Sequence, residues 1–77
     1  MINIKNKGYL IALGKHLRIL REMRNLSQEN LANDSDIPIN QVGRIERGEI
    51  NTTVSTIYSI AKALEVEPKE LLDFKFK

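Results

Sequence analysis

Apolar residues recur along the chain at helical spacing, and polar clusters separate the helical stretches. Leu13, Leu17 and Leu20 follow one another at i, i+4 and i+7, so they lie on one face of a predicted helix. Residues 26–48 contain two shorter helical patterns, which the polar run of residues 33–36 separates. This arrangement predicts two short helices joined by a tight break.

The residues at the ends of these two short helices suit their positions. Ser27 is a favourable N-cap for the first helix, and Pro38 fits the first turn of the second. Gly48 is a typical residue at a helix C-terminus. Two helices of about eight to ten residues with so short a break match the helix-turn-helix geometry, which presents its second helix to the DNA major groove.

Two more helices are predicted towards the C-terminus. Thr53 is suited to cap one of them, and Pro68 is suited to open the other at its first position. The apolar faces of the predicted helices form one core, made of Leu13, Leu17, Leu20, Leu31, Ala32, Val42, Ile45, Ile57, Ile60, Ala61 and Leu64. The expected fold is a compact, all-α domain of five helices over residues 9–77, preceded by a flexible N-terminal arm at residues 1–8.

The second helix of the pair has one face without carboxylates. At about 100° per residue, Asn40, Gly43, Arg44 and Arg47 lie on the side opposite the apolar Val42. Arginine can pair with guanine, asparagine or glutamine can pair with adenine, and glycine leaves room for close approach. This face therefore predicts a surface that reads bases and binds phosphates, and two solvated surface arginines are the plainer alternative.

Composition and charge limit the class of protein. At 77 residues with 42% hydrophobic content, the chain can form one modest core and no second domain. The net charge is only +2, and the basic excess lies in residues 1–24, whereas carboxylates outnumber Arg44 and Arg47 in residues 25–50. Affinity for nucleic acid would thus rest on a small patch, and we expect weak non-specific binding.

Few residues of the chain suggest catalysis or a cofactor. The sequence has no cysteine and one histidine, His16, which excludes disulfides, thiol chemistry and a Cys/His zinc site. No serine or carboxylate pair accompanies His16 at a convincing spacing, so we expect no enzyme. The longest apolar run, residues 9–13, is too short for a signal peptide or a membrane span. We predict a cytoplasmic protein without metal, cofactor, membrane contact or small-molecule effector.

Longer motifs extend from Leu13 to Leu72. They are LGKHLRILREMRNLSQENLA, INQVGRIERGE, TIYSIAKALEV and PKELL. In these motifs the chain strongly resembles the lambda repressor and Cro-like (Xre) helix-turn-helix family. Its size is similar to that of small stand-alone regulators in this family, such as restriction-modification controller proteins and phage-type repressors. The resemblance implies a lambda repressor-like DNA-binding domain.

This resemblance and the chemistry of the helix face together assign roles to individual residues. The expected base-reading residues are Ile39, Asn40, Gln41, Gly43 and Arg44. The expected phosphate-binding residues are Ser27, Gln28, Arg47, Asn51 and Thr52. The resemblance also implies an ion pair between Arg21 and Glu46, which would fix the recognition helix against the first helix of the domain.

Several residues depart from the family pattern. Where the family usually has glycine in a left-handed turn, this chain has Asn25, Asp36 and Glu65. Pro38 replaces a capping serine, and Glu49 puts a negative charge in the loop that is expected near phosphate. We therefore expect left-handed backbone at three residues other than glycine.

The apolar C-terminal end is the expected homodimer contact, because an exposed apolar cluster usually marks an interface. Its residues are Leu71, Leu72, Phe74 and Phe76. The alternative is that the two leucines cap the core. We predict a transcriptional regulator that binds double-stranded DNA as a homodimer on a pseudo-palindromic operator. A second interpretation is an antitoxin-like interaction module, in which this apolar end binds another protein and DNA binding is secondary.

Overall fold

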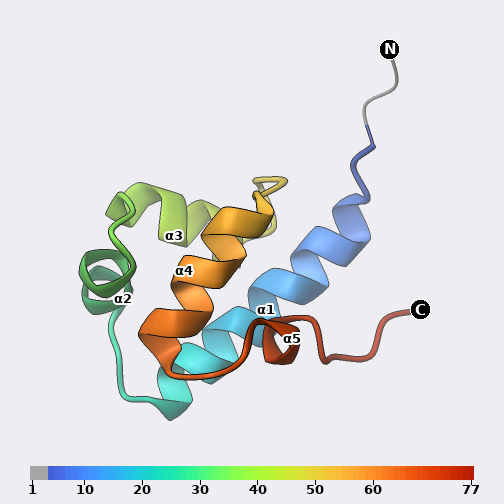
Figure 1. Cartoon of the computed structure of the whole chain (residues 1–77). Helices are drawn as coiled ribbons and strands as arrows, with labels where there is room; N and C mark the ends of the chain where they lie inside the picture. Colours follow the sequence, from blue (N-terminus) through green and yellow to red (C-terminus); the bar gives the residue numbers. More distant parts are fainter. Residues whose placement is uncertain (1–3) are drawn as a thin grey trace.

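A computed structural model of the chain describes residues 4–77 and contains five helices in that range (Figure 1). These are α1 (Lys7–Met23), α2 (Gln28–Ser35), α3 (Ile39–Glu46), α4 (Val54–Leu64) and α5 (Pro68–Leu71). No strand occurs among the described residues, which confirms the expected all-α fold. No helix in this part of the chain is long and apolar enough to cross a membrane.

Three helices, α2, α4 and α5, begin at the residues that the sequence indicates. Ser27 and Thr53 each accept a hydrogen bond from a backbone N–H in the first turn of α2 and α4. Pro68 is the first residue of α5. Pro38 precedes α3 and provides no side-chain cap, so the first turn of α3 lacks a stabilising hydrogen bond worth about 0.5 to 2 kcal/mol in other helices.

The N-terminal end of α1 differs from the expected boundary at Tyr9. α1 begins at Lys7, because the side chain of Asn6 accepts a hydrogen bond from the backbone N–H of Tyr9 at 2.9 Å and caps the helix. Residues 7 and 8, which the sequence places in the arm, are therefore helical. Residues 1–3 of that arm lie outside the described part of the chain.

The three expected left-handed turns are confirmed. Asn25, Asp36 and Glu65 have φ values of 57°, 60° and 60°. Asp36 ends α2 and Glu65 ends α4. Asn25 and Asp36 are of residue types that tolerate this conformation, whereas Glu65 adopts it at a cost of about 1 kcal/mol relative to glycine.

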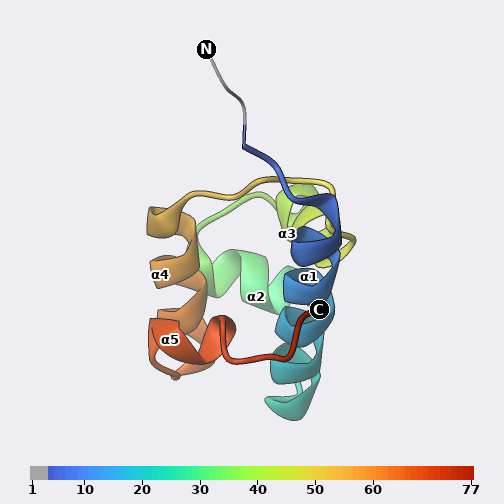
Figure 2. The ribbon, with the colours of Figure 1, turned by 90° about the vertical axis from the view of Figure 1, so that its right-hand side faces the viewer.

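The core lies where the helices meet. Figure 2 shows α1 on one side and α4 with α5 on the other, with α2 between them and α3 at the top. All predicted core residues are buried except Leu20 and Ile57, which are partly buried at its margin. Leu10 and Leu71 are also buried, although the sequence pattern did not place them in the core.

α1 passes close to the C-terminal end of α3 at two glycines. A Cβ atom at Gly14 would lie 2.5 Å from the carbonyl oxygen of Ile45 and closer still to that of Glu46. Gly48, which follows α3 with a φ of +74°, lies against the backbone of Ile11. Because neither position has room for a side chain, α1 supports α3 through direct backbone contact.

Candidate nucleic-acid interface

The outer face of α3 carries the expected base-reading residues. Ile39, Asn40 and Arg44 are exposed, and Gln41 is half-buried. Asn40 and Arg44 are four residues apart in the helix, so their side chains are neighbours on one surface. α3 therefore presents an amide and a guanidinium group side by side, as base-edge recognition requires.

Gly43 has a different position from the one we expected. It is buried, and a Cβ atom there would lie 3.0 Å from Nη1 of Arg47 and 3.6 Å from Oε1 of Gln28. In this structure the side chain of Arg47 covers Gly43, and the expected contact of Gly43 with a base stays a prediction. The missing side chain instead makes room for the guanidinium group of Arg47 beside α3.

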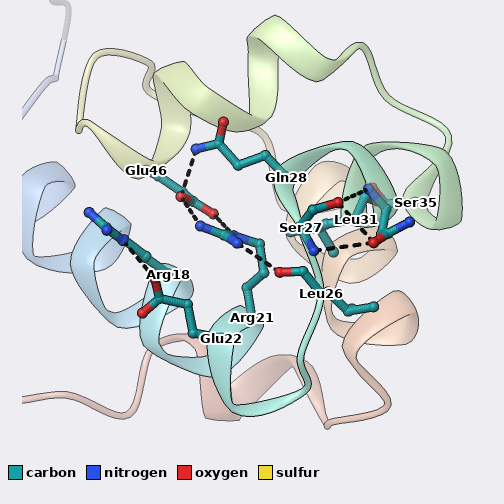
Figure 3. A network of polar contacts seen from close by, with 10 residues as sticks. Arg18, Arg21, Glu22, Leu26, Ser27, Gln28, Leu31, Ser35 and Glu46 are labelled. Atoms are coloured by element: carbon teal, nitrogen blue, oxygen red, sulfur yellow. Dashed lines mark hydrogen bonds and ion pairs between the residues drawn. The ribbon is translucent and has the colours of Figure 1, made fainter.

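A buried polar network attaches α3 to the rest of the domain (Figure 3). Nε of Arg21 donates a hydrogen bond to Oε2 of Glu46 at 2.6 Å, and Nη2 donates to Oε1 at 3.1 Å. Nη1 of Arg21 donates to the carbonyl oxygen of Leu26 at 2.7 Å. Only 8% of each of Arg21 and Glu46 is exposed. The structure thus brings the two residues together and joins α1, α3 and the start of the helix-turn-helix.

Gln28 from α2 completes the network. Its Nε2 donates a hydrogen bond to Oε1 of Glu46 at 2.9 Å, and Figure 3 shows Glu46 between Gln28 and Arg21. A side-chain amide has two N–H donors, so this bond leaves a second donor for a phosphate. Gln28 is thereby fixed in place at the edge of α3.

The pKa of Arg21 lies above its ordinary value, first because its guanidinium donates hydrogen bonds to Glu46. Burial acts in the opposite direction, and the negative charges of Glu46 and Glu22 add to the increase. Arg21 therefore stays charged inside the network.

The other expected phosphate-binding residues make local contacts. Ser27 caps α2, and its Oγ also donates to Oδ1 of Asn30 at 2.8 Å. Asn51 is exposed and donates to the carbonyl oxygen of Ile4 at 2.9 Å, which connects the loop after α3 to the segment before α1. The Oγ1 atom of Thr52 is buried without a hydrogen-bond partner among the described residues.

Glu49 forms exposed ion pairs with Arg44 of α3 and with Arg47, the residue at the C-terminal end of that helix. Nε of Arg47 donates to Oε2 of Glu49 at 2.8 Å, and Nε of Arg44 lies 3.6 Å from Oε1. The pKa of Glu49 lies below its ordinary value, mainly because of the hydrogen bond from Arg47, with a further contribution from the charge of Arg44. The sequence indicated the charge of Glu49 but not these contacts.

We expect NMR titration of the carboxyl carbons to show Glu49 below its ordinary pKa of 4.5. Arg47→Ala should raise the pKa of Glu49 towards that ordinary value, because the hydrogen bond is lost. The matched control is Arg18→Ala, which removes an arginine from an exposed pair on α1. An Arg47→Ala variant in which Glu49 titrates as it does in the Arg18→Ala control would refute the pairing.

The C-terminal tail folds back on α1. The ring of Phe74 lies 5.1 Å from that of Tyr9 and 5.5 Å from that of His16, measured between centroids. Phe76 lies 5.1 Å from Tyr9 in an edge-to-face arrangement. Nε2 of His16 donates to the carbonyl oxygen of Glu70 at 2.7 Å. His16 therefore joins α1 to α5, a role that its position in the sequence did not indicate.

This packing corrects one residue of the expected dimer contact. Leu71 is fully buried, so it caps the core and cannot contact a second copy. Phe74 is half-buried, and Leu72 and Phe76 remain 49% and 44% exposed. The free apolar surface of this end is thus smaller than the sequence suggested.

Known proteins are similar to this chain in sequence. A family model described as helix-turn-helix matches residues 17–71. The control protein C.BamHI of Bacillus amyloliquefaciens is 42% identical over 65 residues, which covers 83% of this chain and 80% of that protein. The control protein C.SmaI of Serratia marcescens is 42% identical over 60 residues, with 78% and 71% covered.

A solved structure has a similar sequence identity to this chain and a similar fold. The crystal structure of the restriction-modification controller protein C.AhdI from Aeromonas hydrophila superposes with a TM-score of 0.80 at 44% sequence identity. The match covers 80% of this chain and 94% of that one. Fold and sequence therefore agree on the same group of proteins.

Proposed function

Because the chain belongs to the helix-turn-helix family whose model matches residues 17–71, we propose that it is a sequence-specific regulator of transcription that binds double-stranded DNA. We assign it to the same kind of protein as the restriction-modification controllers to which it is similar. Such a regulator acts where chromosomal DNA is, so we place it in the cytoplasm.

The observation that carries this proposal is the presentation of α3. Asn40 and Arg44 stand exposed and adjacent on a helix that Glu46 attaches to both neighbouring helices. A helix held at fixed orientation can insert into the major groove with its side chains in register with base edges. The direct test is selection of bound sequences from a random DNA pool, and recovery of no preferred sequence would refute the proposal.

Substitutions on α3 should separate base reading from phosphate binding. Arg44→Ala and Asn40→Ala should each weaken operator binding by about 1 to 3 kcal/mol and relax specificity at one position, because a base-edge contact is lost. Arg47→Ala should weaken binding to all DNA sequences similarly. It should also reduce the magnitude of the slope of log affinity against log salt concentration by about one unit. Titrations on operator and scrambled duplexes at several salt concentrations measure both effects. Unchanged discrimination by the Arg44 and Asn40 variants would contradict the assignment.

We further propose that the regulator works as a homodimer. One recognition helix has too small a footprint to find an operator among roughly 10⁶ or more competing sites, and a second copy doubles it. A two-fold dimer would place the recognition helices about 34 to 36 Å apart and require a pseudo-palindromic operator. Leu72 and Phe76 are the exposed apolar residues that this end offers to the second copy.

Sedimentation at micromolar concentration tests the proposed contact. We expect a dimer for the wild type and at least about tenfold weaker association for Leu72→Ser with Phe76→Ser, because two apolar side chains leave the interface. Val54→Ser is the control, since Val54 is more exposed but lies at the start of α4. A monomeric wild type, or a double variant that associates unchanged, would place the interface elsewhere.

A further inference from the structure

In the loop after α3, the carboxylate of Glu49 contacts Arg44 and Arg47, the two arginines that we expect to bind DNA. Arg47 donates two hydrogen bonds to Glu49, from Nε at 2.8 Å and from Nη2 at 3.4 Å. The same carboxylate lies 3.6 Å from Nε of Arg44. All three side chains are about half exposed, so the pairs lie on the surface that the recognition helix presents. Glu49 therefore occupies N–H donors of Arg47 that a phosphate oxygen would need.

The backbone fixes Glu49 in this position. The backbone N–H of Gly48 donates to the carbonyl oxygen of Ile45 at 3.0 Å, and that of Glu49 donates to Arg44 at 2.9 Å. Gly48 has a φ of +74°, which turns the chain back towards the end of the helix. On the other side of Arg47, Gly43 leaves room for the guanidinium group. The turn at Gly48 thus places Glu49, and the space at Gly43 accommodates the guanidinium group of Arg47.

We propose that Glu49 is an internal competitor of DNA phosphate, which sets how strongly the regulator binds DNA of any sequence. The inference rests on the proposed DNA-binding function. Before Arg47 can contact a phosphate it must leave Glu49, and the carboxylate then faces the negatively charged DNA. The ion pair with Glu49 therefore weakens the phosphate contact of Arg47. It does not weaken the contact of Asn40 with a base edge. Occupancy then depends more on base reading, which limits retention on non-specific DNA.

This mechanism has a signature in the salt dependence. A freed Arg47 that neutralises one phosphate releases counterions, whereas an uncovered Glu49 takes up a cation and cancels part of that release. The Glu49→Gln variant keeps the shape of the side chain and removes its charge. It should bind operator and scrambled DNA about three- to tenfold more tightly near 0.1 M salt. Its slope of log affinity against log salt should be steeper by less than about one unit, because Glu49 cancels only part of the release in the wild type.

Fluorescence anisotropy with labelled duplexes tests the proposal. The duplexes carry the sequence that the wild type selects from a random pool and a scrambled version of it. The matched control is Glu22→Gln, which removes the same charge from an exposed arginine pair on α1, away from α3. Comparison of the two variants separates a local effect of Glu49 from the change in net charge.

A double-mutant cycle with Arg47→Ala distinguishes competition from simple repulsion of DNA by Glu49. Competition predicts that Glu49→Gln improves binding less than about twofold once Arg47 is absent, because only the longer pair with Arg44, at 3.6 Å, is then left to be broken. An equal gain in both backgrounds would overturn the proposal. So would equal affinities of Glu49→Gln and Glu22→Gln with a wild type that binds DNA. A wild type that binds neither duplex at low salt would overturn the proposed function and this inference with it.

Discussion

Replacing Gly14 with alanine is expected to remove a large part of the stability of the domain. The added Cβ would lie 2.5 Å from the carbonyl oxygen of Ile45 and closer to that of Glu46. Both are backbone atoms at the end of α3, so neither can rotate away as a side chain would. Separating α1 from α3 would open the core, at a cost of about 3 kcal/mol or more. A domain of 77 residues has a total stability of only about 4 to 12 kcal/mol.

Gly8→Ala is the matched control for this prediction. Gly8 also lies in α1, but a Cβ atom there meets its nearest neighbours at 3.6 Å, which is ordinary van der Waals contact. Alanine is favoured over glycine in a helix by about 0.5 to 1 kcal/mol, so this variant should melt about 2 to 8 °C higher than the wild type. Thermal and urea unfolding followed by circular dichroism measures both. A Gly14→Ala variant as stable as Gly8→Ala would show that α1 and α3 are not in backbone contact.

The fold could be predicted because its signals are local. Ser27, Thr53 and Pro68 mark helix starts by chemistry within one turn, and apolar spacing identifies the inner face of each helix. The close approach at Gly14 could not be predicted in this way. A glycine inside a helical pattern carries no periodic signal, and its partner is more than thirty residues away, at the end of α3.

Helix geometry was enough to predict which side chains of α3 point outward. The contacts that depend on the turn after α3 could not be predicted from the sequence. Rotation by about 100° per residue places Asn40 and Arg44 outward, and both are exposed. The pairing of Arg47 with Glu49 depends on the left-handed turn at Gly48, which sets the direction of the next side chain.

The C-terminal tail shows the same limit. Apolar residues in a short tail give the same sequence pattern whether they pack on their own chain or on a second copy. The structure divides them, since Leu71 enters the core and Phe74 packs on Tyr9, while Leu72 stays exposed. Which tail residues are buried depends on contacts with α1, such as that between Phe74 and Tyr9. The order of apolar residues in the tail does not reveal these contacts.

Arg21→Met should lower the free energy of unfolding by about 3 to 5 kcal/mol, because it leaves the carboxylate of Glu46 buried without its cation. Among residues 4–77, the hydrogen bond from Gln28 at 2.9 Å is the one that would remain to that carboxylate. Arg18→Met is the control on the same helix, since Arg18 pairs with Glu22 at 3.1 Å in an exposed position. Such a pair is worth about 0 to 1 kcal/mol. Similar urea midpoints for the two variants would contradict the prediction.

A second substitution separates stability from orientation. Arg21→Met combined with Glu46→Leu removes both charges, and we expect it to recover at least about 2 kcal/mol, because an apolar pair can replace a buried ion pair. The double variant also loses the anchor that holds Gln28 beside α3. Because the ion pair is a direct link between α1 and α3, we expect operator affinity to stay at least about tenfold below that of the wild type even where stability returns. Recovery of stability and operator affinity together would show that the pair contributes charge compensation alone and does not position the recognition helix.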